Sequence, residues 1–290
     1  MFEDTTFRGD QNTLRGPFNR CIYCGDDSDI ASLNHEHAAP EALGARLVLL
    51  KASCPVCKHE IDRFESRCSN QMFAAVRAHL DFNKTKSKGR RRHFPIEVRI
   101  ADRIEQLRVP IEQHPTTLHL PSFAPPGLVM SQPPAIDFTD VRGWTWHLGE
   151  ERAFSEKIRK LREATGADEV IIRGRILGRS FGRLLAKMAH CTAIAMFGVA
   201  EFVPLLPNII TKEDGPIAFL VGGNTILTVR TTQQQGYEYG FGCARNDVTG
   251  HTLLLCTIRL FAWLENTPTY LVVVGEPSSS LMQQLEAPAV

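Results

Sequence analysis

Three stretches near the N-terminus decide most of what this sequence predicts: Cys21-Ile-Tyr-Cys24, Asn34-His35-Glu36-His37-Ala-Ala-Pro40 and Cys54-Pro-Val-Cys57. The two Cys-x-x-Cys pairs supply four thiolates at the spacing that tetrahedral Zn²⁺ requires. Four thiolates complete the coordination of the ion and leave no open position for a substrate, so we expect a structural zinc site. In small zinc modules the binding energy of the ion is folding energy, on the order of 10 kcal/mol.

Length and composition indicate the class of protein to which the chain belongs. A chain of 290 residues is long enough for two domains, and 43% hydrophobic with 22% charged residues is typical of a globular protein. The net charge of +1 means that any attraction to nucleic acid must come from a local patch. Eight cysteines are too few for a disulfide scaffold of this length. With no signal-peptide pattern at the first residues and no long apolar run, the sequence predicts a cytoplasmic protein without a membrane partner.

The segment from about residue 18 to 80 resembles the HNH (ββα-metal) endonuclease family, in particular its four-cysteine zinc branch. The matching positions are Cys21, Cys24, Glu36-His37, Pro40, Leu43-Gly44, Cys54, Cys57 and Glu65. The resemblance implies an enzyme that hydrolyses phosphodiester bonds of DNA with a divalent metal ion. In that interpretation His37 is the general base, and Glu36 helps to hold a catalytic Mg²⁺ or Mn²⁺.

One position departs from the family pattern. Lys58 stands directly after the last cysteine, where related nucleases often carry an Asn that completes the catalytic metal site. A charged ammonium cannot ligate a metal. Three alternatives stay open: His59 or Asp62 supplies the missing ligand, Lys58 itself contacts a phosphate, or the segment is an inactive zinc module that binds nucleic acid or a protein partner.

The alternating direction of side chains along a strand limits whether Glu36 and His37 can bind the same metal ion. In a regular strand, His35 and His37 share one face and Glu36 points to the other. A bulge or an early strand end is therefore required if Glu36 and His37 are to approach one metal ion. If the strand stays regular, His35 with His37 is the functional pair instead.

A basic run follows the zinc segment and contains no acidic residue. Its members are Lys84, Lys86, Lys88, Arg90, Arg91 and Arg92. Beside a nuclease-like segment such a run favours phosphate contact without sequence preference. We expect DNA as the partner, with RNA as the alternative.

The chain as a whole predicts an α+β fold, with a small zinc-stapled ββα-metal domain followed by a larger mixed α/β domain. The expected boundaries are residues 1–95 for the first domain with its basic tail, 96–139 for a Pro-rich connection, and 140–290 for a mixed domain of unknown function. In the first domain, 33–37 and 46–50 are expected to form a hairpin and 61–80 a helix with one apolar face. Farther along, the pattern predicts helices at 154–163 and 180–197 and strands at 169–172, 216–223, 253–264 and 270–274.

Overall fold

The structure of the protein, a computed structural model, describes residues 3–6, 13–82, 92–139, 141–223, 236–246 and 249–286. It is a mixed α+β fold with several sheets, as the sequence predicts. The chain divides into two compact units that interleave along the sequence. The first unit comprises residues 1–66, 121–142 and 178–290, and the second comprises 67–120 and 143–177. The sequence had predicted three consecutive segments instead.

The first unit begins with the elements that carry the cysteine pairs. They are β2 (Thr13–Arg15), η1 (Ile30–Ser32), β3 (Asn34–His37), η2 (Glu41–Leu43), β4 (Leu47–Ser53) and α1 (Pro55–Arg67). Strands β3 and β4 pair antiparallel, and β2 pairs parallel with β4 on its other edge. The expected hairpin is therefore present. Helix α1 buries Cys57, Ile61 and Phe64, which recur at helical spacing on one face.

The rest of the first unit is an antiparallel sheet with short helices around it. Its elements are β1 (Glu3–Thr6), α4 (Gly178–Phe197), β10 (Phe202–Pro204), α5 (Pro207–Thr211), α6 (Ile217–Leu220), β11 (Val221–Gly223), β12 (Tyr237–Arg245), β13 (Thr252–Leu260), β14 (Thr269–Pro277) and α7 (Ser279–Glu286). The order across the sheet is β1-β12-β13-β14-β10, and β11 also pairs with β14. Strand β13 is buried on both faces, which explains its almost continuous apolar sequence.

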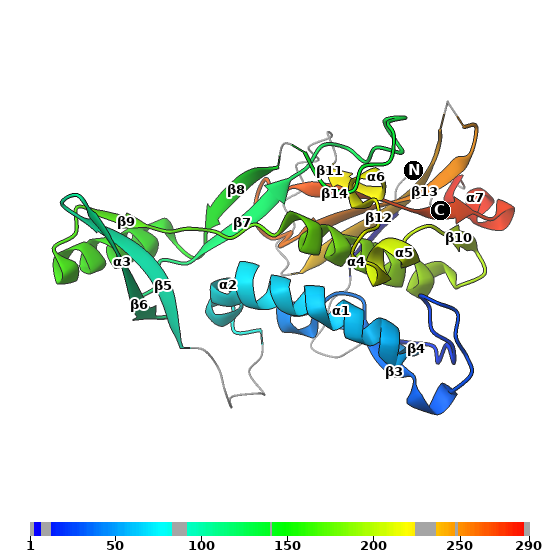
Figure 1. The fold of residues 1–290 in the computed structure, drawn as a ribbon, viewed down its shortest axis with the longest axis horizontal. Helices are drawn as coiled ribbons and strands as arrows, with labels where there is room; N and C mark the ends of the chain where they lie inside the picture. The colour runs from blue at the N-terminus through cyan, green and yellow to red at the C-terminus, as the bar shows by residue number, and fades with distance from the viewer. Residues whose placement is uncertain are drawn as a thin grey trace. The chain divides into compact units, whose positions relative to one another are not determined.

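Helix α4 is the centre of the first unit. Every residue from Phe181 to Ile194 is buried. The helix contacts β13 and β14 of the large sheet and also β4 of the hairpin. Figure 1 shows α4 between the sheet and the layer formed by α1, β3 and β4. A helix buried all round must satisfy its polar side chains inside the protein, and α4 carries several.

The second unit has its own core. Its elements are η3 (Cys68–Met72), α2 (Ala74–His79), β5 (His93–Ile100), β6 (Arg103–Pro110), β7 (Thr117–Ser122), β8 (Arg142–His147), α3 (Glu151–Thr165) and β9 (Glu169–Ile171). Strands β6-β5-β9 form one sheet and β7-β8 another. Helix α3 packs Leu161 against Ile96, Val98 and Val109 of the three-stranded sheet.

Two sequence predictions are corrected at the level of elements. The stretch 216–223 was expected to be one strand, but Ile217–Leu220 forms a helical turn and only Val221–Gly223 pairs in the sheet. The stretch 61–80 was expected to be one helix, but a turn of π-helix at Cys68–Met72 separates α1 from α2. In both stretches the spacing of the apolar residues fits more than one type of secondary structure.

Candidate metal centre

The four cysteines of the two Cys-x-x-Cys pairs come together in the first unit. Their sulfur atoms all lie within 4.8 Å of one another. Cys24 Sγ and Cys54 Sγ are 3.7 Å apart, close to the roughly 3.8 Å edge of a tetrahedron with Zn–S bonds of about 2.3 Å. Three of the four are buried and Cys24 is exposed. The donor set and spacing fit a zinc ion held by thiolates alone.

Backbone geometry prepares the first pair for this role. Gly25 follows Cys24 with φ of +79°, a conformation that glycine adopts without strain. Its N–H donates to Cys21 O at 2.9 Å, and Cys21 N–H donates to Asp26 O at 2.8 Å. The Cys57 thiol and nearby backbone amides lower the pKa of the Cys21 thiol to about 4. The loop therefore favours a thiolate at Cys21, the form that binds metal.

The second pair sits at the start of helix α1. Cys57 N–H points toward Cys54 Sγ at 3.5 Å, and Lys58 N–H donates to Cys54 O at 2.9 Å. Within the part of the chain that the structure describes, these four cysteines are the only group of three or more His, Cys, Asp or Glu side chains placed closely enough to hold an ion.

Strand β3 contains a bulge, one of the two irregularities that Glu36 and His37 would need to approach one metal ion. The register with β4 shifts between Asn34 and Glu36, so His35 lies in a bulge and is exposed. His35 Nδ1 accepts a hydrogen bond from Lys51 N–H at 3.2 Å. From there Glu36 pairs with Leu49 and His37 with Val48 in regular register. Consecutive paired residues point to opposite faces, so the bulge does not aim Glu36 and His37 at one point.

Glu36 faces helix α4 and is completely buried. Lys187 of α4, also completely buried, places Nζ 2.8 Å from Glu36 Oε1 and 2.6 Å from Glu65 Oε1 of α1. The same ammonium donates to His37 O. Lys187 of α4 thus joins two groups of β3, the Glu36 carboxylate and the His37 carbonyl, to the Glu65 carboxylate of α1.

The charges of this cluster stabilise one another. Burial alone would lower the pKa of Lys187, but the carboxylates of Glu36 and Glu65 outweigh it and raise that pKa well above the usual value. Burial raises the pKa of Glu65, and Lys187 opposes that rise. The cluster therefore sets one ammonium against two carboxyl groups.

Hydrogen bonding at Glu36 is incomplete among the described residues. The ion-pair distance to Lys187 is short, yet neither Glu36 oxygen accepts a hydrogen bond of good geometry. His37 Nδ1 is likewise buried without a partner. Burial, followed by the charge of Lys187, lowers the pKa of His37, which favours the neutral imidazole.

The other residues proposed for the catalytic ion lie apart from Glu36. Lys58 Nζ pairs with Asp62 Oδ1 at 2.6 Å, one helical turn along α1. Glu36 and this hydrogen bond to Asp62 outweigh burial and raise the pKa of Lys58. His59 is exposed on α1. Neither His59 nor Asp62 joins Glu36 in a ligand cluster among the described residues.

Most of the basic run lies outside the described residues. This applies to Lys84, Lys86, Lys88, Arg90 and Arg91, whereas Arg92 is described and exposed. Their expected contact with phosphates stays a prediction.

Sequence reasoning missed the polar stripe of α4 that meets the zinc-binding elements. His190 Nε2 donates to Ile22 O at 2.9 Å. Cys191 Sγ lies 3.2 Å from Tyr23 Oη. The signal in the sequence is the recurrence of Arg183, Lys187 and His190 at steps of four and three in an apolar helix. That spacing indicates one polar stripe but does not say which residues it meets.

Comparisons with known proteins give no relative for this chain: no protein-family model, no curated protein and no solved structure matches it. Among the described residues, no helix combines the length and apolar character that crossing a membrane would need.

Proposed function

We propose that this protein is a DNA-binding zinc protein whose nuclease-like segment, a zinc-stapled ββα unit, does not hydrolyse DNA. The observation that carries the proposal is the position of Lys187. Its Nζ lies within 2.8 Å of both Glu36 and Glu65 carboxylates, and the side chains of Lys187 and Glu36 are fully buried.

An ammonium in this place opposes metal catalysis in two ways. A divalent cation beside Glu36 would have to displace the Lys187 charge or approach it, and like charges repel strongly in a buried site. Helix α4 also covers Glu36, which has no exposed surface, so a phosphate of DNA does not reach it. The geometry supports a structural role for the nuclease-like residues.

DNA contact is assigned to the basic run at 84–92. Six cations without an intervening carboxylate give a local positive patch on a chain whose net charge is only +1. Each phosphate contact made by such a segment contributes affinity without sequence preference and with strong salt dependence.

One assay tests the non-hydrolytic part. Plasmid and single-stranded DNA are incubated with the zinc-loaded protein in Mg²⁺, Mn²⁺ or a chelator, alongside His37→Ala and the exposed control His59→Ala. We expect no cleavage above the chelator background in any sample. Cleavage that requires a divalent ion and disappears only in His37→Ala would overturn this part of the proposal.

A second assay tests DNA binding separately. The observed binding constant is measured against salt concentration for the wild type and for a variant with the six basic residues replaced by Gln. For full engagement of six phosphates, the slope of log K against log salt should become shallower by about 5 in the variant. A matched control replaces exposed Arg152 and Lys160 of α3. Equal slopes for wild type and the six-Gln variant would reject the basic run as the contact.

The second candidate is the metal-dependent endonuclease itself, with His37 as base. It is favoured by the lowered pKa of His37 and by the oxygens of Glu36, which accept no hydrogen bond of good geometry and which a cation or water would satisfy. It requires Lys187 to leave Glu36, so it predicts cleavage that rises in Lys187→Ala. The first candidate predicts no such gain.

A further inference from the structure

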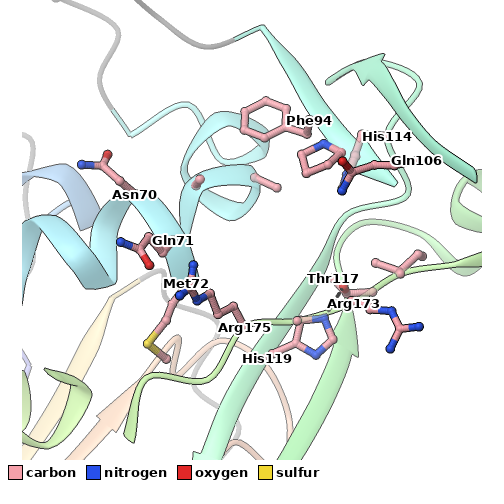
Figure 2. A pocket seen from close by; sticks show the side chains of 15 residues that line it. Asn70, Gln71, Met72, Phe94, Gln106, His114, Thr117, His119, Arg173 and Arg175 are labelled. Carbon is pink, nitrogen blue, oxygen red and sulfur yellow. Dashed lines mark hydrogen bonds between the residues drawn. The ribbon is translucent and has the colours of Figure 1, made fainter. Parts of the chain in front are cut away.

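A hollow of mixed polar and apolar lining in the second unit has no part in the function proposed above. It measures about 530 Å³ and is lined from η3, α2, β5, β6, β7 and the segment after β9. This volume lies in the usual range for small-molecule sites, about 300 to 1,000 Å³. Figure 2 shows Gln71 and Met72 on one side of the hollow and Phe94 and Gln106 on the other.

The hollow is lined by positively charged but not by negatively charged side chains. The lining includes two arginines, Arg173 and Arg175, and no Asp or Glu. Arg173 Nε is paired with Glu97 at 2.6 Å. Arg175 has no ion-pair partner among the described residues, and in Figure 2 its side chain extends into the hollow whereas that of Arg173 points away. The hollow therefore offers one uncompensated guanidinium, whose planar donors match a phosphate group.

The backbone that carries Arg175 is held in place by a histidine. His119 Nε2 lies 2.7 Å from Thr117 Oγ1, and its Nδ1 lies 2.9 Å from Thr145 Oγ1. The fixed ring packs directly on Gly174, where an added Cβ would come within 2.0 Å of His119 Cγ. Only glycine permits this approach. The contact sets the position of the segment between the two arginines.

The remaining polar groups of the hollow suit a nucleobase better than a simple anion. Gln71 and Gln106 are exposed amides without a described partner, and both line the hollow. Side-chain amides donate and accept side by side, which is the pattern that nucleobase edges present. Met72 and Phe94 add apolar surface of the kind that contacts a base or sugar.

We propose that this hollow binds a nucleoside monophosphate, with Arg175 on the phosphate and the glutamine amides on the base. The same chemistry is available from a free nucleotide and from the 5′-phosphorylated end of a nucleic-acid strand. The proposal does not depend on the function assigned to the zinc-binding segment.

Calorimetric titration of the full, zinc-loaded chain tests the site. The ligands are the four common nucleoside monophosphates, their unphosphorylated nucleosides, inorganic phosphate, and a short oligonucleotide with and without a 5′-phosphate. At least one monophosphate or the 5′-phosphorylated strand should bind, and more tightly than its unphosphorylated counterpart and than inorganic phosphate. If the free nucleotide binds, the ligand of the hollow is a free nucleotide. If only the 5′-phosphorylated strand binds, the ligand is the end of a nucleic-acid strand.

Two substitutions make the test specific. Arg175→Gln should weaken binding at least 10-fold, since it removes the charge-assisted hydrogen bonds to the phosphate. Arg152→Gln, an exposed arginine of α3 outside the hollow, should leave it unchanged. Because Arg175 is exposed, its loss should not unfold the unit, and circular dichroism checks this. Equal affinity of wild type and Arg175→Gln, or no binding of any phosphorylated ligand at millimolar concentration, would overturn the proposal.

Discussion

At the scale of single residues, Lys187 is the buried charge partner of Glu36 and Glu65. Its fully buried ammonium pairs with the fully buried Glu36 and with Glu65, which keeps a little exposed surface. Nothing in the local sequence of β3 or α1 indicates this partner, because Lys187 follows Glu65 by 122 positions. The sequence therefore identifies Glu36 and Glu65 as candidate site residues but does not identify Lys187 as their partner.

Replacing Lys187 by Met should lower the free energy of unfolding by about 3 to 5 kcal/mol, because it removes the buried ammonium that pairs with Glu36 and Glu65. Urea denaturation at pH 7 measures the change. Lys160→Met provides the control, since Lys160 is an exposed lysine whose ion pair with Glu156 contributes little. A Lys187→Met protein as stable as the control would contradict an ionised cluster.

His114 should make the second unit sensitive to acid. It is buried, and burial lowers its pKa to about 4, against about 6.5 in the unfolded chain. Below pH 6.5 the unfolded state binds a proton that the folded state does not, so stability falls as the pH decreases toward 4. The loss between pH 7 and pH 5 is about 2 kcal/mol.

The measurement is urea denaturation at both pH values for wild type, His114→Gln and the exposed control His147→Gln. His114→Gln should lose about 2 kcal/mol less than the wild type over this interval, and His147→Gln should behave as the wild type. If all three proteins lose the same amount, His114 is not the group that titrates.

At the scale of elements, local patterns predict well and long-range pairings do not. The hairpin of β3 and β4, the helices α3 and α4 and the strands β13 and β14 all follow from spacing within about 20 residues. The hairpin of β5 and β6 was missed, because its first strand follows the basic run and contains Pro95. The edge strand β1 pairs with β12, more than 230 positions later, and no periodicity reveals that pairing.

The four-cysteine cluster belongs to this scale, because it brings the loop before β3 together with the start of α1. Cys54→Ser should abolish stoichiometric zinc, since a hydroxyl is a poor substitute for a thiolate at a soft site. Metal analysis of the purified protein gives the zinc content. Cys243→Ser, which changes a cysteine outside the cluster, should retain one zinc per chain. Full zinc in Cys54→Ser would refute the four-thiolate assignment.

At the scale of the whole molecule, the zinc-binding elements and α4 share polar contacts within the first unit. Lys187, His190 and Cys191 reach β3, Ile22 and Tyr23, and Tyr237 of β12 donates to Leu43 O at 2.6 Å. The second unit has a separate core between α3 and its sheet.

Removing the zinc should therefore loosen more than the cysteine loops. Hydrogen exchange of the chelated protein should increase in β3, β4 and the central turns of α4, because the partners of Lys187 and His190 lose their anchorage. Peptides from β5 and β6 serve as the internal control and should exchange at the same rate in the chelated and the zinc-loaded protein. Protection in α4 that survives complete zinc removal would show that the contacts do not depend on the ion.

The separation of Lys187 from its partners has a consequence for biosynthesis. The ribosome completes β3 about 150 residues before it adds Lys187, which corresponds to roughly 10 to 30 s at ordinary elongation rates. During that interval the Glu36 carboxylate lacks the Lys187 ammonium and stays hydrated. The cysteine pairs are complete as soon as residue 57 is made, so the nascent chain can capture zinc first and bury Glu36 only when α4 arrives.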